Sequence, residues 1–203
     1  MTEDEARDWL LSHYGAAKFA MLERYVTLLV DETSRQNLIS PSSIAQIWSR
    51  HIVDSAQLLP MAEQAPGRWI DIGSGAGLPG VVIATLRDGE MMLIEPRRKR
   101  AEFLERCAEA LGLNKVSVRC CRAEVAVDEA AVISARAVGA IEQIFVAAAG
   151  MATDRTVWLL PRGLSGEAEL AQAQKSWHGT FHVEQSLTHA GSTIVVARGV
   201  YRL

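Results

Sequence analysis

The feature that most constrains this chain is a glycine-rich segment, Gly73–Gly80, that directly follows the short run Trp69–Ile72, which is apolar except for Asp71. A buried strand that turns sharply into a helix needs glycines, because they adopt positive φ and let the backbone approach a ligand closely. Such a turn also leaves free backbone amides that suit polar groups of a ligand. The segment therefore predicts an α/β sheet with a ligand site at the end of its first strand.

Beyond Gly67, short apolar runs alternate with helical patterns. This alternation predicts a Rossmann-like, mostly parallel sheet covered on both faces. Two extended stretches, 181–187 and 192–198, predict a closing antiparallel hairpin, which is typical of class I methyltransferase sheets and unusual in dinucleotide dehydrogenases. The expected strands are 69–72, 91–94, 116–118, 131–134, 157–160 and 193–197, with the clearest helix over 98–111.

Residues 1–66 lack strand signals and carry apolar residues at helical spacing, as in the two stretches 22–30 and 44–58. We expect this part to be a helical region packed on the core, and residues 67–203 to form the ligand-binding domain. Pro41 disfavours helix at the residue before it, so Ser42 or Ser43 is expected to cap the following helix.

Composition narrows the class of protein. A net charge of −3 over 203 residues excludes a uniformly basic nucleic-acid binder but permits a local basic face. Three cysteines make no disulfide framework, and no apolar run approaches the ~20 residues that span a bilayer. The charged N-terminal residues do not resemble a secretory signal. We expect a cytoplasmic monomer with no membrane contact and no metal site.

The ligand of the turn is indicated by acidic residues around it. Gly75–Gly80 matches the dinucleotide pattern G-x-G-x-x-G, which alone is a weak signal. Asp71 suits a ligand amino group and would repel a pyrophosphate, which favours S-adenosylmethionine. Glu95 follows the second strand at the spacing of a ribose-binding acid. Ala123 and Glu124 follow the third strand, where a backbone amide and a carboxylate can meet an adenine.

Two simpler interpretations stay open for these residues. The turn could be structural without a ligand, and Glu95 could be a surface carboxylate paired with Arg97 or Arg98. Glu124 could likewise begin a solvated helix.

The fourth strand usually faces the methyl acceptor, and the motifs that it lacks are compatible with guanine N7 as the acceptor without requiring it. The segment 133–138 contains no Asn/Asp-Pro-Pro-aromatic motif for amine methylation and no Pro-Cys nucleophile. Guanine N7 already carries a free lone pair, so its methylation needs alignment and electrostatics but no general base. Arg97, Arg98 and Arg162 lie where they could contact RNA. A run of charged residues is also common on the solvent-exposed face of a helix that binds nothing.

Several motifs together resemble a known family, the bacterial 16S ribosomal RNA guanine-N7 methyltransferases, also called glucose-inhibited division protein B. The Leu-Pro-Gly end of the turn, combined with the arginine of the fourth strand, is more specific than the glycines alone. The resemblance covers nearly the whole chain and rests on Asn37–Ser40, Arg50–Ser55, Asp71–Gly80, Glu95-Pro96 with the basic residues after it, Arg122–Glu124, Ser134–Ala137 and Leu160–Gly163.

The resemblance implies an S-adenosylmethionine-dependent enzyme that methylates N7 of guanine 527, in the 530-region of 16S rRNA, within a 30S or assembly-intermediate particle. It implies that the lone pair of guanine N7 attacks the methyl group on the sulfonium directly, with no general base and no covalent enzyme intermediate. Arg136 could contact either the cofactor or the guanine, and Arg162 stands where lysine is commoner. The cofactor residues are Gly73, Leu78, Ala123, Glu124 and Arg136, joined by Asp71, Gly75 and Glu95; the candidate substrate residues are Arg97, Arg98, Arg162, Asn37 and His51.

Two alternatives belong to other functional classes. In the first, the chain is a small-molecule methyltransferase whose helical N-terminal region covers the acceptor as a lid; apolar helices facing the site would favour it, and a basic open cleft would favour RNA. In the second, the chain is a non-catalytic nucleotide- or RNA-binding module.

Overall fold

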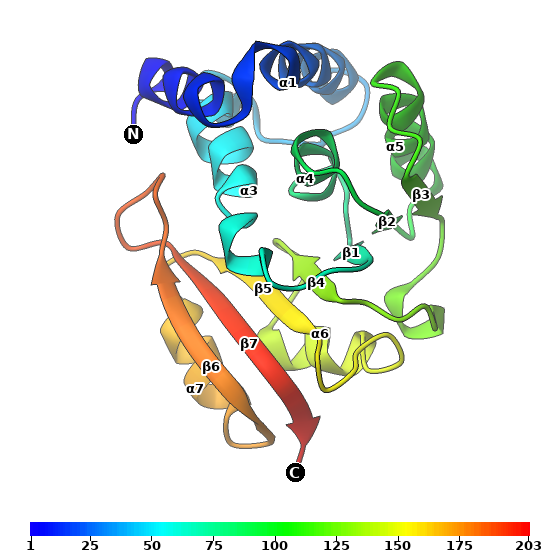
Figure 1. Cartoon of the computed structure of the whole chain (residues 1–203), viewed down its shortest axis with the longest axis vertical. Coiled ribbons are helices and arrows are strands. Elements are labelled where there is room, and N and C mark those ends of the chain that lie inside the picture. The colour runs from blue at the N-terminus through cyan, green and yellow to red at the C-terminus, as the bar shows by residue number, and fades with distance from the viewer.

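Strand–helix alternation produces a single sheet in the computed structural model, which describes residues 1–203 (Figure 1). The seven strands lie in the order β3-β2-β1-β4-β5-β7-β6; β1 to β5 are parallel, and β7 is antiparallel to both β5 and β6. The predicted Rossmann-like sheet with a C-terminal hairpin is thereby confirmed. The strands are β1 Trp69–Ile72, β2 Met91–Ile94, β3 Val116–Arg119, β4 Val132–Ala135, β5 Val157–Arg162, β6 Trp177–Gln185 and β7 Thr193–Arg202.

The N-terminal region is helical, as expected. Its longest helix, α1, is kinked at Gly15, whose φ of 77° and ψ of 168° are not helical. Ser40, with extended backbone, occupies the cap position of α2, so the prediction of Ser42 or Ser43 was wrong; Pro41 itself takes the first helical position. The segments are α1 Glu3–Thr33, α2 Pro41–Ile44, the π-helical η1 Trp48–Val53, α3 Asp54–Ala56 and η2 Pro60–Ala62.

The remaining helices connect the strands: α4 Gly80–Leu86, α5 Arg98–Ala110, η3 Ala123–Val125, α6 Ile141–Ala147 and α7 Gly166–Ala173. Among all the helices, none combines the length and the apolar character needed to cross a membrane.

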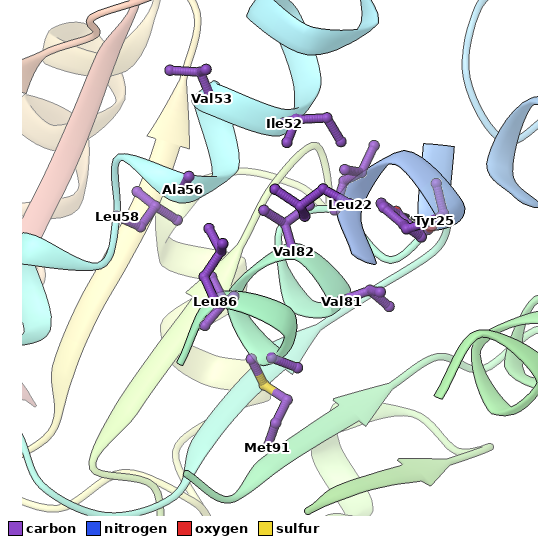
Figure 2. Packing of buried hydrophobic residues seen from close by; sticks show 14 of the residues in the cluster. Leu22, Tyr25, Ile52, Val53, Ala56, Leu58, Val81, Val82, Leu86 and Met91 are labelled. Carbon is purple, nitrogen blue, oxygen red and sulfur yellow. Dashed lines mark hydrogen bonds between the residues drawn. The ribbon is translucent and has the colours of Figure 1, made fainter. Parts of the chain in front are cut away.

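Side chains alternate between the two faces of the sheet, and this divides the core in two. Trp69, Leu93 and Val132 point to one face. They belong to a cluster of 32 buried residues that also contains residues of α1, α4 and α5. Figure 2 shows Leu22 and Tyr25 of α1 meeting α4 and the segment 52–58 in this cluster. The opposite face packs against α6 and α7 in a second cluster of 21 residues. The N-terminal helices thus share one core with the sheet, while the boundary at residue 66 stays a prediction.

One buried hydrogen bond fixes the glycine-rich turn to the N-terminal region. Tyr25 is fully buried, and its Oη donates to the carbonyl of Ala76 at 2.7 Å. The Cβ of any larger residue at position 77 would lie 3.0 Å from this hydroxyl and 2.6 Å from Cγ2 of Val81. Helix α1 therefore helps to set the path of the turn that the sequence singled out.

Candidate active site

The turn after β1 is shaped by glycines that no other residue could replace without strain. Gly73, Gly75 and Gly77 have φ of 64°, 52° and 91°, a region that side-chain-bearing residues rarely adopt. A Cβ on Gly73 would lie 2.7 Å from Cγ2 of Val138. The turn therefore brings its backbone close to the segment that follows β4.

Glu95 holds the turn from the neighbouring strand. Its side chain is buried; Oε2 accepts a hydrogen bond from the amide of Gly75 at 2.9 Å, and Oε1 accepts from the amide of Arg97 at 2.8 Å. It forms no ion pair with a basic side chain, and Arg98 instead pairs with Glu102 at 2.9 Å. Each carboxylate oxygen keeps a further lone pair, so Glu95 has capacity left for ligand hydroxyls.

Asp71 lies beneath the turn. Its side chain is fully buried, and its Oδ1 accepts a hydrogen bond from the Ser134 hydroxyl at 2.7 Å. The Ser134 hydroxyl in turn accepts a hydrogen bond from the indole N–H of Trp69 at 2.9 Å. Oδ2 faces the Gly80 amide without completing a hydrogen bond. Burial raises the pKa of Asp71 to about 6, against the lowering effect of its hydrogen bonds. The expected contact of Asp71 with a ligand amino group stays a prediction.

A cavity of about 570 Å³ lies beside the turn and takes its walls from Ile72, Glu124, Val138 and Gly139, among others. Its size is within the range of small-molecule sites. Glu124 pairs with Arg122 at 3.0 Å, and this hydrogen bond lowers the pKa of Glu124. Gly73, Gly75, Glu95 and this cavity are called the glycine-turn site below.

A second cavity, of about 340 Å³, lies at the carboxyl ends of β4 and β5 and is called the arginine cavity. It is lined by Arg50, Arg136 and Arg162, by Asp54 and Glu169, and by polar residues of the β6–β7 turn. Three guanidinium groups face two carboxylates there, so the local charge is positive although the whole chain is acidic.

Arg136 reaches the arginine cavity from β4 and is held by the N-terminal region. Its Nη1 pairs with Oδ2 of Asp54 at 3.0 Å, and its Nη2 lies 3.3 Å from Nδ1 of His51. Nε2 of His51 lies 2.9 Å from the Ser43 hydroxyl. Burial lowers the pKa of His51 to about 4, and the charges of Arg136 and Arg50 add to this effect. His51 is therefore neutral near pH 7.

The structure groups some predicted residues and separates others. Arg136, Arg162 and His51 lie at or beside the arginine cavity, whereas Ala123 is buried close to Glu124. Arg97 and Arg98 are exposed at the start of α5, and the carbonyl of Asn37 accepts from Arg100 at 3.2 Å. Leu78 is buried in the core. Of the predicted site residues, Glu124 lines the 570 Å³ cavity, and Arg136 and Arg162 line the arginine cavity. The others line neither cavity: Asn37, His51, Asp71, Gly73, Gly75, Leu78, Glu95, Arg97, Arg98 and Ala123.

Sequence reasoning missed the role of Asp54. Besides Arg136, its carboxylate accepts from Nε2 of Gln57 at 2.8 Å and from the hydroxyl of Thr188 at 3.2 Å. It therefore joins the N-terminal region, β4 and the β6–β7 turn. The run Arg50–Ser55 carried part of the family resemblance, but no local pattern pairs Asp54 with residues so distant in the chain.

Comparisons with known proteins find relatives that align with nearly the whole chain. The chain is 44% identical to a ribosomal RNA small subunit methyltransferase G from Sphingopyxis alaskensis over 97% of its own length and 86% of the relative's. It is 45% identical to the protein of that name from Rhizorhabdus wittichii, covering 98% and 94% of the two chains.

Solved structures support the fold. A SAM-dependent methyltransferase from Aquifex aeolicus aligns with a TM-score of 0.62 at 12% identity, over 82% of this chain and 97% of that one. A mutant of MtNAS in complex with S-adenosylmethionine aligns with a TM-score of 0.61 at 16% identity, over 98% and 84%.

The profile of the family described as "GidB: rRNA small subunit methyltransferase G" matches residues 18–196. This span contains Gly73, Gly75, Glu95, the whole arginine cavity and every residue that lines the 570 Å³ cavity except Arg202. The chain therefore belongs to the GidB family of rRNA small subunit methyltransferase G proteins.

Proposed function

We propose that the chain transfers a methyl group from S-adenosylmethionine to N7 of guanine 527 in bacterial 16S rRNA. The observation that carries the proposal is the family match over residues 18–196, because it covers the glycine-rich turn, Glu95 and the arginine cavity. The relatives it matches are named for methylation of small-subunit ribosomal RNA.

The residues of the glycine-turn site fit the cofactor. Glu95 is buried and has free lone pairs for ribose hydroxyls, while Gly73 and Gly75 keep the backbone clear of side chains. Ile72 and Val138 give the 570 Å³ cavity an apolar wall suited to an adenine ring. When bound, S-adenosylmethionine supplies an electrophilic methyl group on its sulfonium.

The arginine cavity fits an anionic acceptor better than a small apolar molecule. Arg50, Arg136 and Arg162 supply positive charge at the carboxyl edge of the sheet, where acceptors of α/β enzymes bind. His51 is neutral near pH 7 and bonded to Ser43. The task of these residues is to bind and orient the RNA, because guanine N7 has no proton to remove.

Methyl transfer from tritiated S-adenosylmethionine tests the proposal, with naked 16S rRNA and intact 30S subunits from a strain lacking this activity as substrates. Chemical cleavage at N7-methylguanine then maps the modified base. We expect one cleavage, at guanine 527. The proposal would be overturned if neither substrate were methylated, or if the methyl group were found at another position.

A further inference from the structure

Arg162 has an unusual environment for a guanidinium. Its side chain is only 6% exposed, and its one hydrogen bond runs from Nη1 to the carbonyl of Gly139 at 2.8 Å. Nε and Nη2 are buried without a hydrogen-bond partner. Buried donors without acceptors destabilise a fold, so two unused donors at the wall of a cavity indicate that this residue is arranged for a ligand.

The neighbouring acid does not use these donors. Oε2 of Glu169 lies 3.7 Å from Nε of Arg162, which is beyond hydrogen-bond distance, and this oxygen has no partner either. Glu169 is instead bonded through Oε1 to the Ser165 hydroxyl at 2.6 Å. Glu169 thus balances part of the charge of Arg162 but leaves its hydrogen-bonding capacity free.

The rest of the arginine cavity favours an anion. Arg50 is exposed, and its guanidinium forms no ion pair or hydrogen bond. The charge of Asp54 is matched by Arg136 at 3.0 Å. The β6–β7 turn adds the hydroxyl of Ser192 to the cavity wall, whereas the Thr188 hydroxyl already donates to Asp54 at 3.2 Å. Arg50 is therefore the unpaired cation of the cavity, and Arg162 is the one whose ion pair with Glu169, at 3.7 Å, leaves its Nε and Nη2 without a hydrogen bond.

We infer that Arg162, together with Arg50, binds a backbone phosphate of the RNA beside the nucleotide that is methylated. A planar guanidinium presents paired donors that match phosphate oxygens, and every nucleotide of an RNA carries a phosphate. The cavity lies at the carboxyl end of β4, the strand that leads into Arg136. The inference rests on the proposed function, since it takes RNA as the substrate.

The test compares Arg162→Gln with Arg155→Gln. Arg162 is the last residue of β5, whereas Arg155 precedes the other end of the strand, is exposed and lines neither cavity. For each variant, RNA binding is measured by fluorescence anisotropy at several salt concentrations with S-adenosylhomocysteine present, and the KM for RNA is measured by methyl transfer. Calorimetry gives the Kd of S-adenosylmethionine, and circular dichroism monitors folding.

Arg162→Gln is expected to raise the KM for RNA about tenfold and to change the cofactor Kd less than twofold. The slope of log K against log salt should shrink by about 0.7, the value for one phosphate contact with a single strand. Arg155→Gln should behave as the wild type. An Arg162→Gln protein that is folded but has wild-type KM and salt slope would overturn the inference.

Arg50→Gln is the second variant, because an exposed residue can be replaced without endangering the fold. If Arg162→Gln fails to fold, the inference stands or falls on a reduced salt slope in Arg50→Gln. If the wild-type protein binds RNA but transfers no methyl group, the proposed function is refuted. The salt dependence of RNA binding by the variants still tests whether Arg162 and Arg50 bind a phosphate. A site that prefers an acidic peptide to RNA would overturn the inference.

Discussion

The glycine-turn site and the arginine cavity lie at the same edge of the sheet but are built in different ways. The hydrogen bonds that hold the glycine-rich turn use the backbone and join neighbouring strands: the amide of Gly75 and the carboxylate of Glu95 are 20 residues apart. The arginine cavity depends on side chains brought from far along the chain, with 82 residues between Asp54 and Arg136 and 134 between Asp54 and Thr188.

This difference has a consequence for mutation. A site made of backbone turns is sensitive to any added Cβ, and its ligand contacts are held by the fold itself. A site made of distant side chains can lose its substrate while the fold and the other site remain intact. Four substitutions can break or sharpen this contrast.

The largest effect is expected for Gly80→Ala, at the start of α4. The added Cβ would collide with Cδ2 of Leu93 and would lie 2.8 Å from Oδ2 of Asp71, both in the buried core. Overpacking of this kind costs about 3 kcal/mol of unfolding free energy. Gly163→Ala is the matched control, because no atom lies within 4 Å of its Cβ position. Equal stability of the two variants in urea denaturation would contradict the backbone argument.

Glu95→Gln should come next and should act on cofactor binding rather than on RNA binding. In glutamine, an NH2 group replaces one of the two carboxylate oxygens of Glu95. That oxygen accepts from the amide of Gly75 or of Arg97, and it is also a possible acceptor for a ligand hydroxyl. Loss of a charged hydrogen bond costs about 2 kcal/mol, or roughly a 30-fold weaker Kd of S-adenosylmethionine by calorimetry. Glu90→Gln, an exposed change just before the same strand, should leave the Kd unchanged. A normal Kd in Glu95→Gln would place the ribose elsewhere.

Arg136→Gln should have a smaller effect and decides the role left open for this residue. The side chain is paired with Asp54 and contacts His51 in the arginine cavity. We therefore expect the KM for RNA to rise about tenfold, equivalent to about 1.4 kcal/mol, with the cofactor Kd within threefold of the wild type. The opposite pattern, a weakened cofactor and a normal KM, would move Arg136 to the glycine-turn site.

The smallest effect is a pH dependence removed by His51→Gln. The pKa of His51 is about 4 in the folded chain against 6.5 as its ordinary value. Between these values the unfolded chain binds the proton and the folded chain does not, so stability falls as pH drops from 6.5 to 4. Allowing for solvent screening of a partly exposed ring, this loss is about 1 kcal/mol.

Asp71 has the opposite slope, since its raised pKa of about 6 means that stability falls as pH rises from 3.8 to 6. The difference between the wild-type and His51→Gln stability curves, obtained from urea denaturation at each pH, cancels the Asp71 contribution. A difference curve that is flat from pH 4 to 6.5 would show that His51 is not held neutral by the fold.

Local patterns predicted the central parallel strands β1, β2, β4 and β5 well because these strands are short and buried. The bounds of β1 and β2 agree with the expected runs, since buried parallel strands are nearly continuous in apolar residues. The hairpin was found, but β6 starts at Trp177 rather than Phe181, because the exposed residues of its first half carry no apolar pattern.

The glycine-turn site was predictable for the same reason. Gly75 and Glu95 follow adjacent parallel strands, and such strand ends meet at one edge of the sheet. The partners of Arg136 were not predictable, because they depend on how η1 and the β6–β7 turn pack around the end of β4. A local sequence pattern predicts that a residue lies at a strand end, but it does not predict which distant carboxylate will pair with it.

Amide hydrogen exchange tests most directly the claim that the two sites bind different ligands. S-adenosylhomocysteine alone should protect the glycine-turn site, at residues 72–77, 95–97 and 138–143. A 16S rRNA fragment alone should protect residues 50–54, 161–165 and 187–193 around the arginine cavity. Protection of residues 72–77 and 95–97 by the RNA fragment alone, with none at 161–165, would contradict the account.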